Sequence, residues 1–186
     1  MTAQDVIQFL TCTPLWINEA ALIFRPNKRN RLYDTTQAKF YTEVTVRVPE
    51  TKTAKRSGKT YQGLQRRRLD LVVLVKPNYR AYELLTIGIE IKVSKHDLLN
   101  DNKMAAYAPY CHLSYLACPY NLVDHAVAKL QELPNFGLLL VTGDEGLISN
   151  PRHPPLFQPT EQHLKEIFSE LLAKQFKENY TERKLQ

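Results

Sequence analysis

The sequence predicts an α/β protein in which helices flank a central mixed β-sheet. Strand-like and helix-like stretches are interleaved along the chain, in the order helical, three strands, helix, strand, helix, strand, helix. The composition agrees, because 44% hydrophobic and 24% charged residues are ordinary for a globular protein. A chain of 186 residues can bury one sizeable core but not two comfortable ones. Residues 1–186 are therefore expected to form a single domain.

The first 42 residues are expected to form a helical extension before the sheet. Residues 5–10 and 17–24 could each be helical, and residues 25–31 read as a polar loop. The hydrophobic periodicity is weakest in this part of the chain. Three roles are therefore considered for it: covering the active-site cleft, recruiting a partner, or completing the core.

Three strands are predicted next. Residues 43–48 alternate strictly between valine and polar side chains, which indicates a half-buried strand. Residues 69–75 form a short, β-branched apolar run that is typical of a buried strand. Residues 76–79 include proline and asparagine, which favour a turn. Residues 81–93 form the following strand, whose isoleucines alternate with glycine, glutamate and lysine. The last two strands are expected to form a hairpin.

The second half of the chain alternates helices and strands. Ser94 is expected to cap a helix, because an acid stands three residues later, and Thr160 is expected to cap the last one. Four prolines favour an extended loop shortly before that last helix. The predicted elements are a helix at 95–107, a strand at 112–118, a helix at 123–133, a strand at 137–142, an extended loop at 150–159 and a C-terminal helix at 160–180.

The net charge of +6 is concentrated in residues 51–68. We interpret this segment as a basic loop insertion, since a like-charged stretch with Ser57 and Gly58 cannot pack on itself. Without its seven basic residues, the chain has one more acid than base. Such a loop suits a polyanion such as nucleic acid, and a solvated hairpin loop is an equal alternative on charge alone. The basic residues are Lys52, Lys55, Arg56, Lys59, Arg66, Arg67 and Arg68.

The cysteines and the N-terminus indicate a cytoplasmic protein with no membrane association. Cys12, Cys111 and Cys118 are odd in number and lack metal-site spacing, which fits reduced thiols. The N-terminal residues show neither a basic region nor a long apolar run, so we expect neither a signal peptide nor a membrane span.

The hairpin brings three charged residues together. Its turn places Asp70 across from a residue between 86 and 90, and Glu90 and Lys92 share a face because strand side chains repeat every two residues. Glu43, on the preceding strand, could be a third acid there. A bound Mg²⁺ or Mn²⁺ would compensate such carboxylates. From spacing alone, a plain Glu–Lys salt bridge on a solvated face is the favoured interpretation.

A longer run of residues resembles a known superfamily. Arg68-Leu69-Asp70 followed on the next strand by Glu90-Ile91-Lys92 resembles the PD-(D/E)XK nucleases, although Leu69 stands where the name-giving proline would be. Further matching stretches resemble the MmcB-like branch, a group of bacterial proteins associated with DNA repair. These stretches are Glu90-Ile-Lys-Val-Ser94, Asp97-Leu, Asp101-Asn-Lys103, Tyr107, Cys111, Tyr115-Leu-Ala-Cys-Pro119 and Gly137-Leu-Leu-Leu-Val-Thr-Gly143.

The resemblance implies a restriction-endonuclease-like, three-layer core and a Mg²⁺- or Mn²⁺-dependent DNA endonuclease or repair nuclease. Asp70, Glu90 and the main-chain carbonyl of Ile91 would hold the metal, and Lys92 would orient or deprotonate the attacking water. Glu43 is the choice for an additional ligand, with Glu19 as a weaker alternative.

The resemblance to these nucleases also implies which molecules the protein would bind. DNA is the expected partner, and Lys103 and Tyr107, four apart on the predicted helix, could contact its backbone. Nucleases of this fold often pair up, so a homodimer or a repair-protein partner is also considered. The alternative function is a non-catalytic nucleic-acid-binding or assembly subunit of a repair or restriction system that keeps the nuclease fold.

Overall fold

The computed structural model describes residues 1–13, 16–17, 38–53, 58–76, 84–143 and 147–184. The strands are β1 (Lys39–Thr53), β2 (Thr60–Val75), β3 (Leu85–Ile91), β4 (Leu113–Pro119), β5 (Phe136–Thr142) and β6 (Leu147–Arg152). The α-helices are α1 (Ala3–Cys12), α3 (Lys95–Asn100), α4 (Met104–Tyr107), α5 (Val123–Gln131) and α6 (Glu161–Lys184). Two 3-10 turns, η2 (Ala108–Tyr110) and η3 (Tyr120–Leu122), flank β4.

The six strands form one mixed sheet in the order β1-β2-β3-β4-β5-β6. β1, β2 and β3 are antiparallel neighbours, β3, β4 and β5 run parallel, and β6 is antiparallel to β5. Parallel neighbours need crossover connections, which α3 and α4 supply between β3 and β4 and α5 supplies between β4 and β5. The predicted α/β class with a mixed sheet is confirmed.

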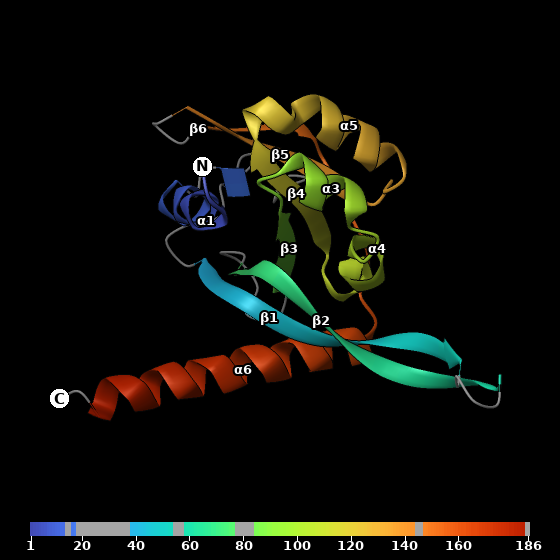
Figure 1. Cartoon of the computed structure of the whole chain (residues 1–186). Helices are drawn as coiled ribbons and strands as arrows, with labels where there is room; N and C mark the ends of the chain where they lie inside the picture. Colours follow the sequence, from blue (N-terminus) through green and yellow to red (C-terminus); the bar gives the residue numbers. More distant parts are fainter. Residues whose placement is uncertain (14–15, 18–37, 54–57, 77–83, 144–146, 185–186) are drawn as a thin grey trace.

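Helices cover both faces of the sheet (Figure 1). One core packs α1, through Val6 and Leu10, against one face of β2, β3 and β4, and Trp16 and Ile17 join it. The other core packs α3 to α6 against the opposite face. Burying apolar area on both faces of the central strands is the main stabilising contribution in such a layered domain.

The central strand β3 depends on a glycine for its packing. Every residue of β3 is buried, and its isoleucines all belong to the core under α1. On the other face a Cβ at Gly88 would lie 2.8 Å from the Cys111 Sγ and 2.9 Å from the Leu69 Cδ2. The two neighbouring segments therefore approach β3 more closely than any side chain at this position would permit.

The predicted hairpin register is observed. Leu71 pairs with Ile89 and Val73 with Ile87, so the next position along β2, Asp70, lies beside Glu90. The alternation within 81–93 is also observed where the chain is described, although the strand is limited to Leu85–Ile91 and residues 77–83 lie outside the described residues.

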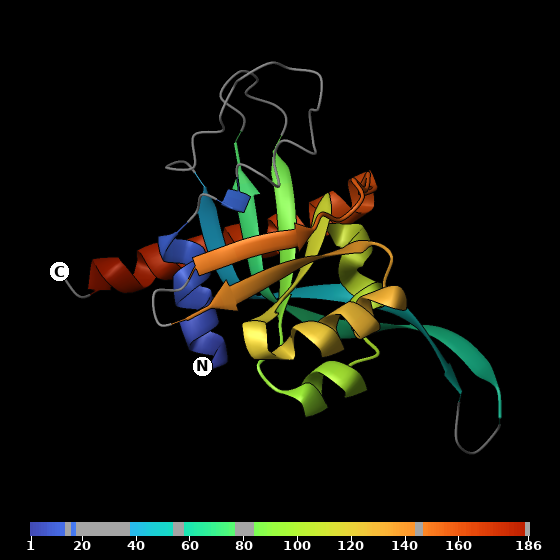
Figure 2. The ribbon, with the colours of Figure 1, turned by 90° about the horizontal axis from the view of Figure 1, so that it is seen from above.

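The prediction of a basic loop at 51–68 is wrong for residues 51–53 and 60–68, which lie on strands, and residues 54–57 lie outside the described residues. β1 continues to Thr53 and β2 begins at Thr60, and the two strands stay paired up to Thr53 and Thr60. The resulting two-stranded ribbon projects from the body of the protein (Figures 1 and 2). The many like charges in this segment favoured a loop. In a two-stranded ribbon, however, successive side chains along a strand point to opposite faces, so neighbouring charges are kept apart and exposed to solvent.

The prediction of one helix over 95–107 is also wrong. α3 ends at Asn100, and α4 begins only at Met104. Between them Asp101 adopts extended backbone angles, and its side chain reaches the Lys92 Nζ at 2.7 Å. The break exchanges helical hydrogen bonds for this ion pair. The predicted Ser94 cap is present, since its side chain accepts a hydrogen bond from the Asp97 N–H.

The ends of the chain follow the prediction in part. α1 confirms the helix at 5–10, whereas residues 18–37 lie outside the described residues. The extended loop predicted at 150–159 begins later, because residues 147–152 form β6, and this outermost strand tolerates Pro151. α6 confirms the C-terminal helix. No helix in the described ranges is both long and apolar enough to cross a membrane.

We predict that Gly88→Ala destabilises the protein. The added Cβ would meet two fully buried neighbours, and overpacking of this kind costs about 1–3 kcal/mol. Chemical denaturation measures the free energy of unfolding. Gly63→Ala on the ribbon is the matched control, because its nearest neighbour is the flexible Lys52 side chain at 3.4 Å. Equal effects of the two substitutions would contradict the packing role of Gly88.

Candidate active site

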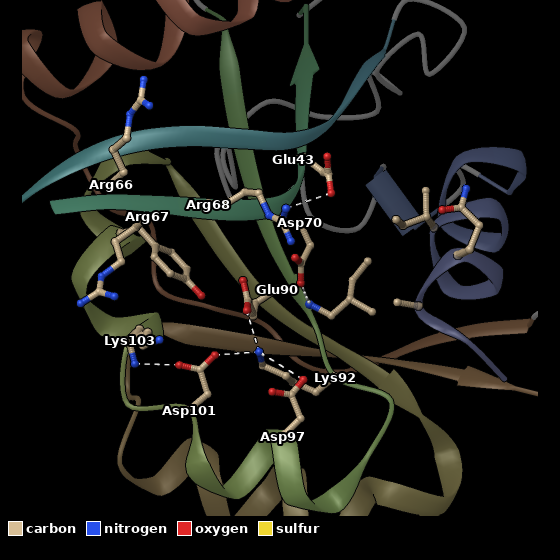
Figure 3. A pocket seen from close by; sticks show the side chains of 15 residues that line it. Glu43, Arg66, Arg67, Arg68, Asp70, Glu90, Lys92, Asp97, Asp101 and Lys103 are labelled. Carbon is tan, nitrogen blue, oxygen red and sulfur yellow. Dashed lines mark hydrogen bonds and ion pairs between the residues drawn. The ribbon is translucent and has the colours of Figure 1, made fainter.

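A pocket of about 600 Å³ lies where β2 and β3 meet α1, α3 and α4. It collects most of the residues singled out from the sequence (Figure 3). Its lining includes Glu43, Arg66, Arg67, Arg68, Asp70, Glu90, Ile91, Lys92, Asp97, Asp101, Lys103 and Tyr107, with Ala3, Gln4 and Ile7 from α1. The tertiary fold thus brings residues from α1, β1, β2, β3, α3 and α4 to one recess.

Asp70 lies at a bend in the β1–β2 ladder. Glu43, opposite it, has a φ of 53°, which is unusual for a residue with a side chain. In a regular strand residues three apart face opposite sides, yet Tyr41 and Val44 pack in the same core. The Asp70 Oδ2 accepts a hydrogen bond of 2.8 Å from the Ile91 N–H, which ties the bend to the end of β3. Burial raises the Asp70 pKa, against the effects of this hydrogen bond and of Lys92.

Glu90 is a buried carboxylate, 5% exposed, on the face of β3 opposite the isoleucines. Its Oε1 accepts a hydrogen bond from Lys92, but its buried Oε2 has no hydrogen-bond partner among the described residues. Burial and the nearby Asp70 raise the pKa of Glu90 to about 7. The Glu90 carboxylate therefore takes up a proton more readily than an ordinary glutamate does.

Lys92 is held by three carboxylates. Its buried Nζ lies 2.8 Å from the Glu90 Oε1, 2.7 Å from the Asp101 Oδ2 and 3.6 Å from the Asp97 Oδ2. Burial opposes the charged form, but the charge of Glu90 and the bond to Asp101 outweigh it, so the Lys92 pKa is raised. Despite its burial, Asp101 has a lowered pKa because of the hydrogen bonds from Lys92 and the Lys103 N–H. Lys92 is a fixed positive charge at the base of the pocket.

Lys103 and Tyr107 both line the pocket. Lys103 is the N-cap of α4 and Tyr107 is its last residue, so they lie four residues apart as predicted but on a shorter helix than 95–107. Tyr107 is 4% exposed, and its hydroxyl lies close enough to the Glu90 carboxylate to favour the charged form of Glu90, which partly offsets the rise of the Glu90 pKa. Burial and the Glu90 charge raise the Tyr107 pKa. Its aromatic ring forms part of the pocket wall beside Glu90.

The predicted basic residues separate into three groups. Arg66, Arg67 and Arg68 line the pocket from β2, and Figure 3 shows Arg68 reaching toward Glu43, with a distance of 3.1 Å between them. Lys52 and Lys59 lie farther out on the ribbon, away from the pocket lining. Lys55 and Arg56 lie outside the described residues.

The sequence does not predict the contacts of Asp97 and Asp101 with Lys92, nor the position of Arg47 opposite Arg66. The spacing of Asp97 from Ser94 predicts only a place at the start of a helix. Asp101 gave no local signal, since its role depends on the end of α3. Arg47 pairs directly with Arg66 across the ladder, and only the register reveals this.

The donor set for a cation consists of two carboxylates. Asp70 and Glu90 lie on neighbouring strands beside Ile91, and Glu43 is 64% exposed at the rim and bound to Arg68. Within the described ranges, no group of three or more His, Cys, Asp or Glu side chains is arranged to hold a metal ion. A metal here would therefore need main-chain or solvent oxygen in addition to these side chains.

Comparisons with known proteins do not identify the family. No family model matches the chain, and no curated protein matches it. A protein of unknown function from Silicibacter pomeroyi, SPO1766, is similar in structure over 75% of this chain and 80% of its own, with 20% identity and a TM-score of 0.47. The structure of SSO0001 matches 83% of this chain and 54% of its own, with 16% identity and a TM-score of 0.23.

We predict that Glu90→Gln stabilises the protein above pH 7. The Glu90 pKa is about 7 when folded and 4.5 in its ordinary environment, so the folded state binds the proton more tightly. The wild type then loses stability as pH rises from about 4.5 to 7, by at most about 3 kcal/mol. Thermal unfolding from pH 4 to pH 8 measures the difference.

The matched control is Asp101→Asn, which should have the opposite sign. The Asp101 pKa is lowered on folding, so its carboxylate stabilises the protein above its ordinary pKa and loses that contribution in acid. A Glu90→Gln variant that gains nothing between pH 5 and pH 8 would show that Lys92 fully compensates the buried charge.

Proposed function

We propose that this protein is a metal-dependent DNA endonuclease or repair nuclease that hydrolyses phosphodiester bonds at Asp70, Glu90 and Lys92. The observation that carries the proposal is the buried Glu90 Oε2, which lacks a hydrogen-bond partner in the described part of the chain and faces a pocket shared with Asp70. An unpaired carboxylate oxygen in a recess is costly unless a ligand compensates it.

The residues present fit Mg²⁺ or Mn²⁺. Asp70 and Glu90 offer hard carboxylate oxygens, and Ile91, whose carbonyl would be a third ligand, lines the same pocket. Burial raises the pKa of both carboxylates, and the charge of Asp70 adds to the rise at Glu90, so a bound cation would offset the cost of their charged forms. A bound divalent ion would supply neutralisation of the phosphate charge and acidification of water.

Lys92 would orient the attacking water and stabilise charge at the phosphate. Its ion pairs with Glu90 and Asp101 keep it charged and aimed into the pocket. For the lysine to accept a proton, cation binding would first have to withdraw Glu90 from it, which would lower the Lys92 pKa. Asp101 would then remain as the group that holds the Nζ in place.

DNA is the substrate class that the surface charge favours. Arg66, Arg67 and Arg68 border the acidic floor of the pocket, so phosphates can be bound at the rim while one of them enters the recess. A cytoplasmic location, which belongs to this proposal, would let the protein reach DNA without crossing a membrane. A second copy of the chain, or a repair protein bound to it, could provide the active site that cuts the other strand of the DNA.

A second candidate function is a nucleic-acid-binding or assembly subunit that keeps the fold without turnover. One observation favours it: Lys92 is engaged by three carboxylates, and the described residues offer no three-ligand metal group. In that case the charge cluster would serve as a structural ion-pair network.

We predict that the protein cleaves DNA in Mg²⁺ or Mn²⁺, and that Asp70→Asn or Lys92→Ala reduces the rate by at least about a hundredfold, since each removes a group from the reacting centre. The assay uses a panel of duplex, single-stranded, flapped and branched DNAs. Asp124→Asn on α5, outside the pocket lining, is the matched control.

DNA affinity is measured beside cleavage on the same variants. Retained affinity with lost cleavage supports the catalytic roles. If the wild type binds the panel but cuts no member of it with either metal, the subunit function replaces the nuclease.

We also predict that Mg²⁺ or Mn²⁺ raises the melting temperature of the wild type at pH 8, because a ligand that binds only the folded state stabilises it, by about 2.7 kcal/mol at a hundredfold excess over Kd. Asp70→Asn should remove most of this gain, and Asp124→Asn should retain it. Equal stabilisation of the wild type and Asp70→Asn would rule out the assigned metal site.

A further inference from the structure

The β1–β2 ribbon carries a row of exposed arginines on one face. Arg47 on β1 lies directly opposite Arg66 on β2, and Arg68 follows two positions along β2 on the same side. All three side chains are exposed. Side chains two apart on a strand are separated by about 6.6–6.8 Å, a step comparable to that between successive phosphates of a nucleic-acid strand.

The Arg47–Arg66 pair is unfavourable by itself. Directly opposed side chains on an antiparallel ladder have Cβ atoms about 4.5–5.5 Å apart, and like charges in this position are destabilising. Neither arginine forms an ion pair with an acid among the described residues. A polyanion that bound both guanidinium groups would convert this repulsion into attraction.

The backbone beneath the row is held rigidly. The Arg47 N–H donates to the Glu166 Oε1 of α6, and the Arg47 carbonyl accepts a hydrogen bond of 2.6 Å from the Tyr110 hydroxyl. Two elements on the body of the protein therefore fix the base of the ribbon. At its other end the row reaches Arg68, which lines the candidate active-site pocket together with Asp70 (the Asp70 pocket). The row therefore leads into the candidate active site.

Beyond Val48 the ribbon is free on both faces. Residues 49–53 and 60–64 are exposed or half-exposed throughout. Tyr61, opposite Lys52, is 53% exposed, and Leu64, opposite Pro49, is 62% exposed. Figure 2 shows the ribbon extending away from the sheet and helices. A free two-stranded ribbon is one of the elements that the major groove of a duplex admits.

Single strands are held differently. Proteins that bind them stack successive bases on aromatic side chains in a basic groove. Of the described residues that line the pocket, the one aromatic is Tyr107, which is 4% exposed and therefore offers no face for stacking. The part of the ribbon beyond Val48, residues 49–53 and 60–64, adds Tyr61 as its one aromatic residue. The observations therefore favour a duplex over a single strand.

We propose that the β1–β2 ribbon is a docking arm for double-stranded nucleic acid, in which Arg47, Arg66 and Arg68 bind successive backbone phosphates and lead the duplex to the Asp70 pocket. The arm deepens the proposed function and rests on its nucleic-acid substrate. It is tested by binding in the absence of metal, whereas the nuclease is tested by cleavage. A failure of either is therefore visible without the other.

The experiment measures the affinity of the wild-type protein for a fluorescent DNA duplex by anisotropy, in EDTA, over a series of salt concentrations. Arg47→Gln/Arg66→Gln should weaken binding and reduce the slope of log affinity against log salt by about 1.8, since each lost phosphate contact contributes about 0.9. Arg47→Lys/Arg66→Lys should keep most of the slope, because lysine still neutralises a phosphate. The matched control is Lys174→Gln/Lys177→Gln on the C-terminal half of α6, at the opposite end of the molecule from the arm (Figure 1).

The outcomes separate clearly. The proposal is supported if the glutamine pair loses slope, the lysine pair and the α6 pair retain it, and the duplex binds more tightly than its single strand. An unchanged slope in the glutamine pair would overturn the arm, and tighter binding of the single strand would overturn the duplex assignment. Thermal unfolding checks the fold, and the glutamine pair should melt no lower than the wild type, because the substitution removes a repulsion.

Discussion

The arrangement of charges around the Lys92 ammonium group constrains much of this structure. A lysine with its Nζ buried must be paired, and here Glu90 and Asp101 contact it at 2.8 and 2.7 Å. The Asp101 contact requires the chain to leave the helix after Asn100, so α3 and α4 are separate elements. The Glu90 contact requires β3 to turn its polar face into the recess. Satisfying one buried charge thus fixes the connection between β3 and β4.

The same cluster is left incomplete on its other side. Glu90 Oε2 has no hydrogen bond from the described residues, Asp70 is half-buried beside it, and both carboxylates have raised pKa values. A network built only for stability would satisfy such atoms, because each unpaired buried group lowers the free energy of unfolding. Arg47 and Arg66 on the neighbouring ribbon are also an unfavourable arrangement, because two like charges lie directly opposite each other. The negative recess and the positive rim are the two features on which the proposed cation and phosphate sites rest.

The bend at Glu43 and Asp70 connects the recess to the ribbon. At the positive φ of Glu43, the positions of β1 that face the core shift from odd, at Tyr41, to even, at Val44, so side chains on both sides of the bend pack in the same core. Strained backbone of this kind persists only where surrounding contacts fix it. Here the Asp70–Ile91 hydrogen bond and the Arg68–Glu43 ion pair lie at the bend itself.

The sequence by itself determined the fold class, most of the strands and the proximity of Asp70, Glu90 and Lys92. These follow from side-chain periodicity and from a hairpin whose register the turn restricts. Tertiary structure decided the pairing of residues 51–53 with 60–62, the break at Asp101, the strand β6, the contacts of Asp97 and Asp101 with Lys92 and the Arg47–Arg66 pair. Each of these depends on contacts between residues far apart in the chain, whose energies exceed the local preferences that a single sequence displays.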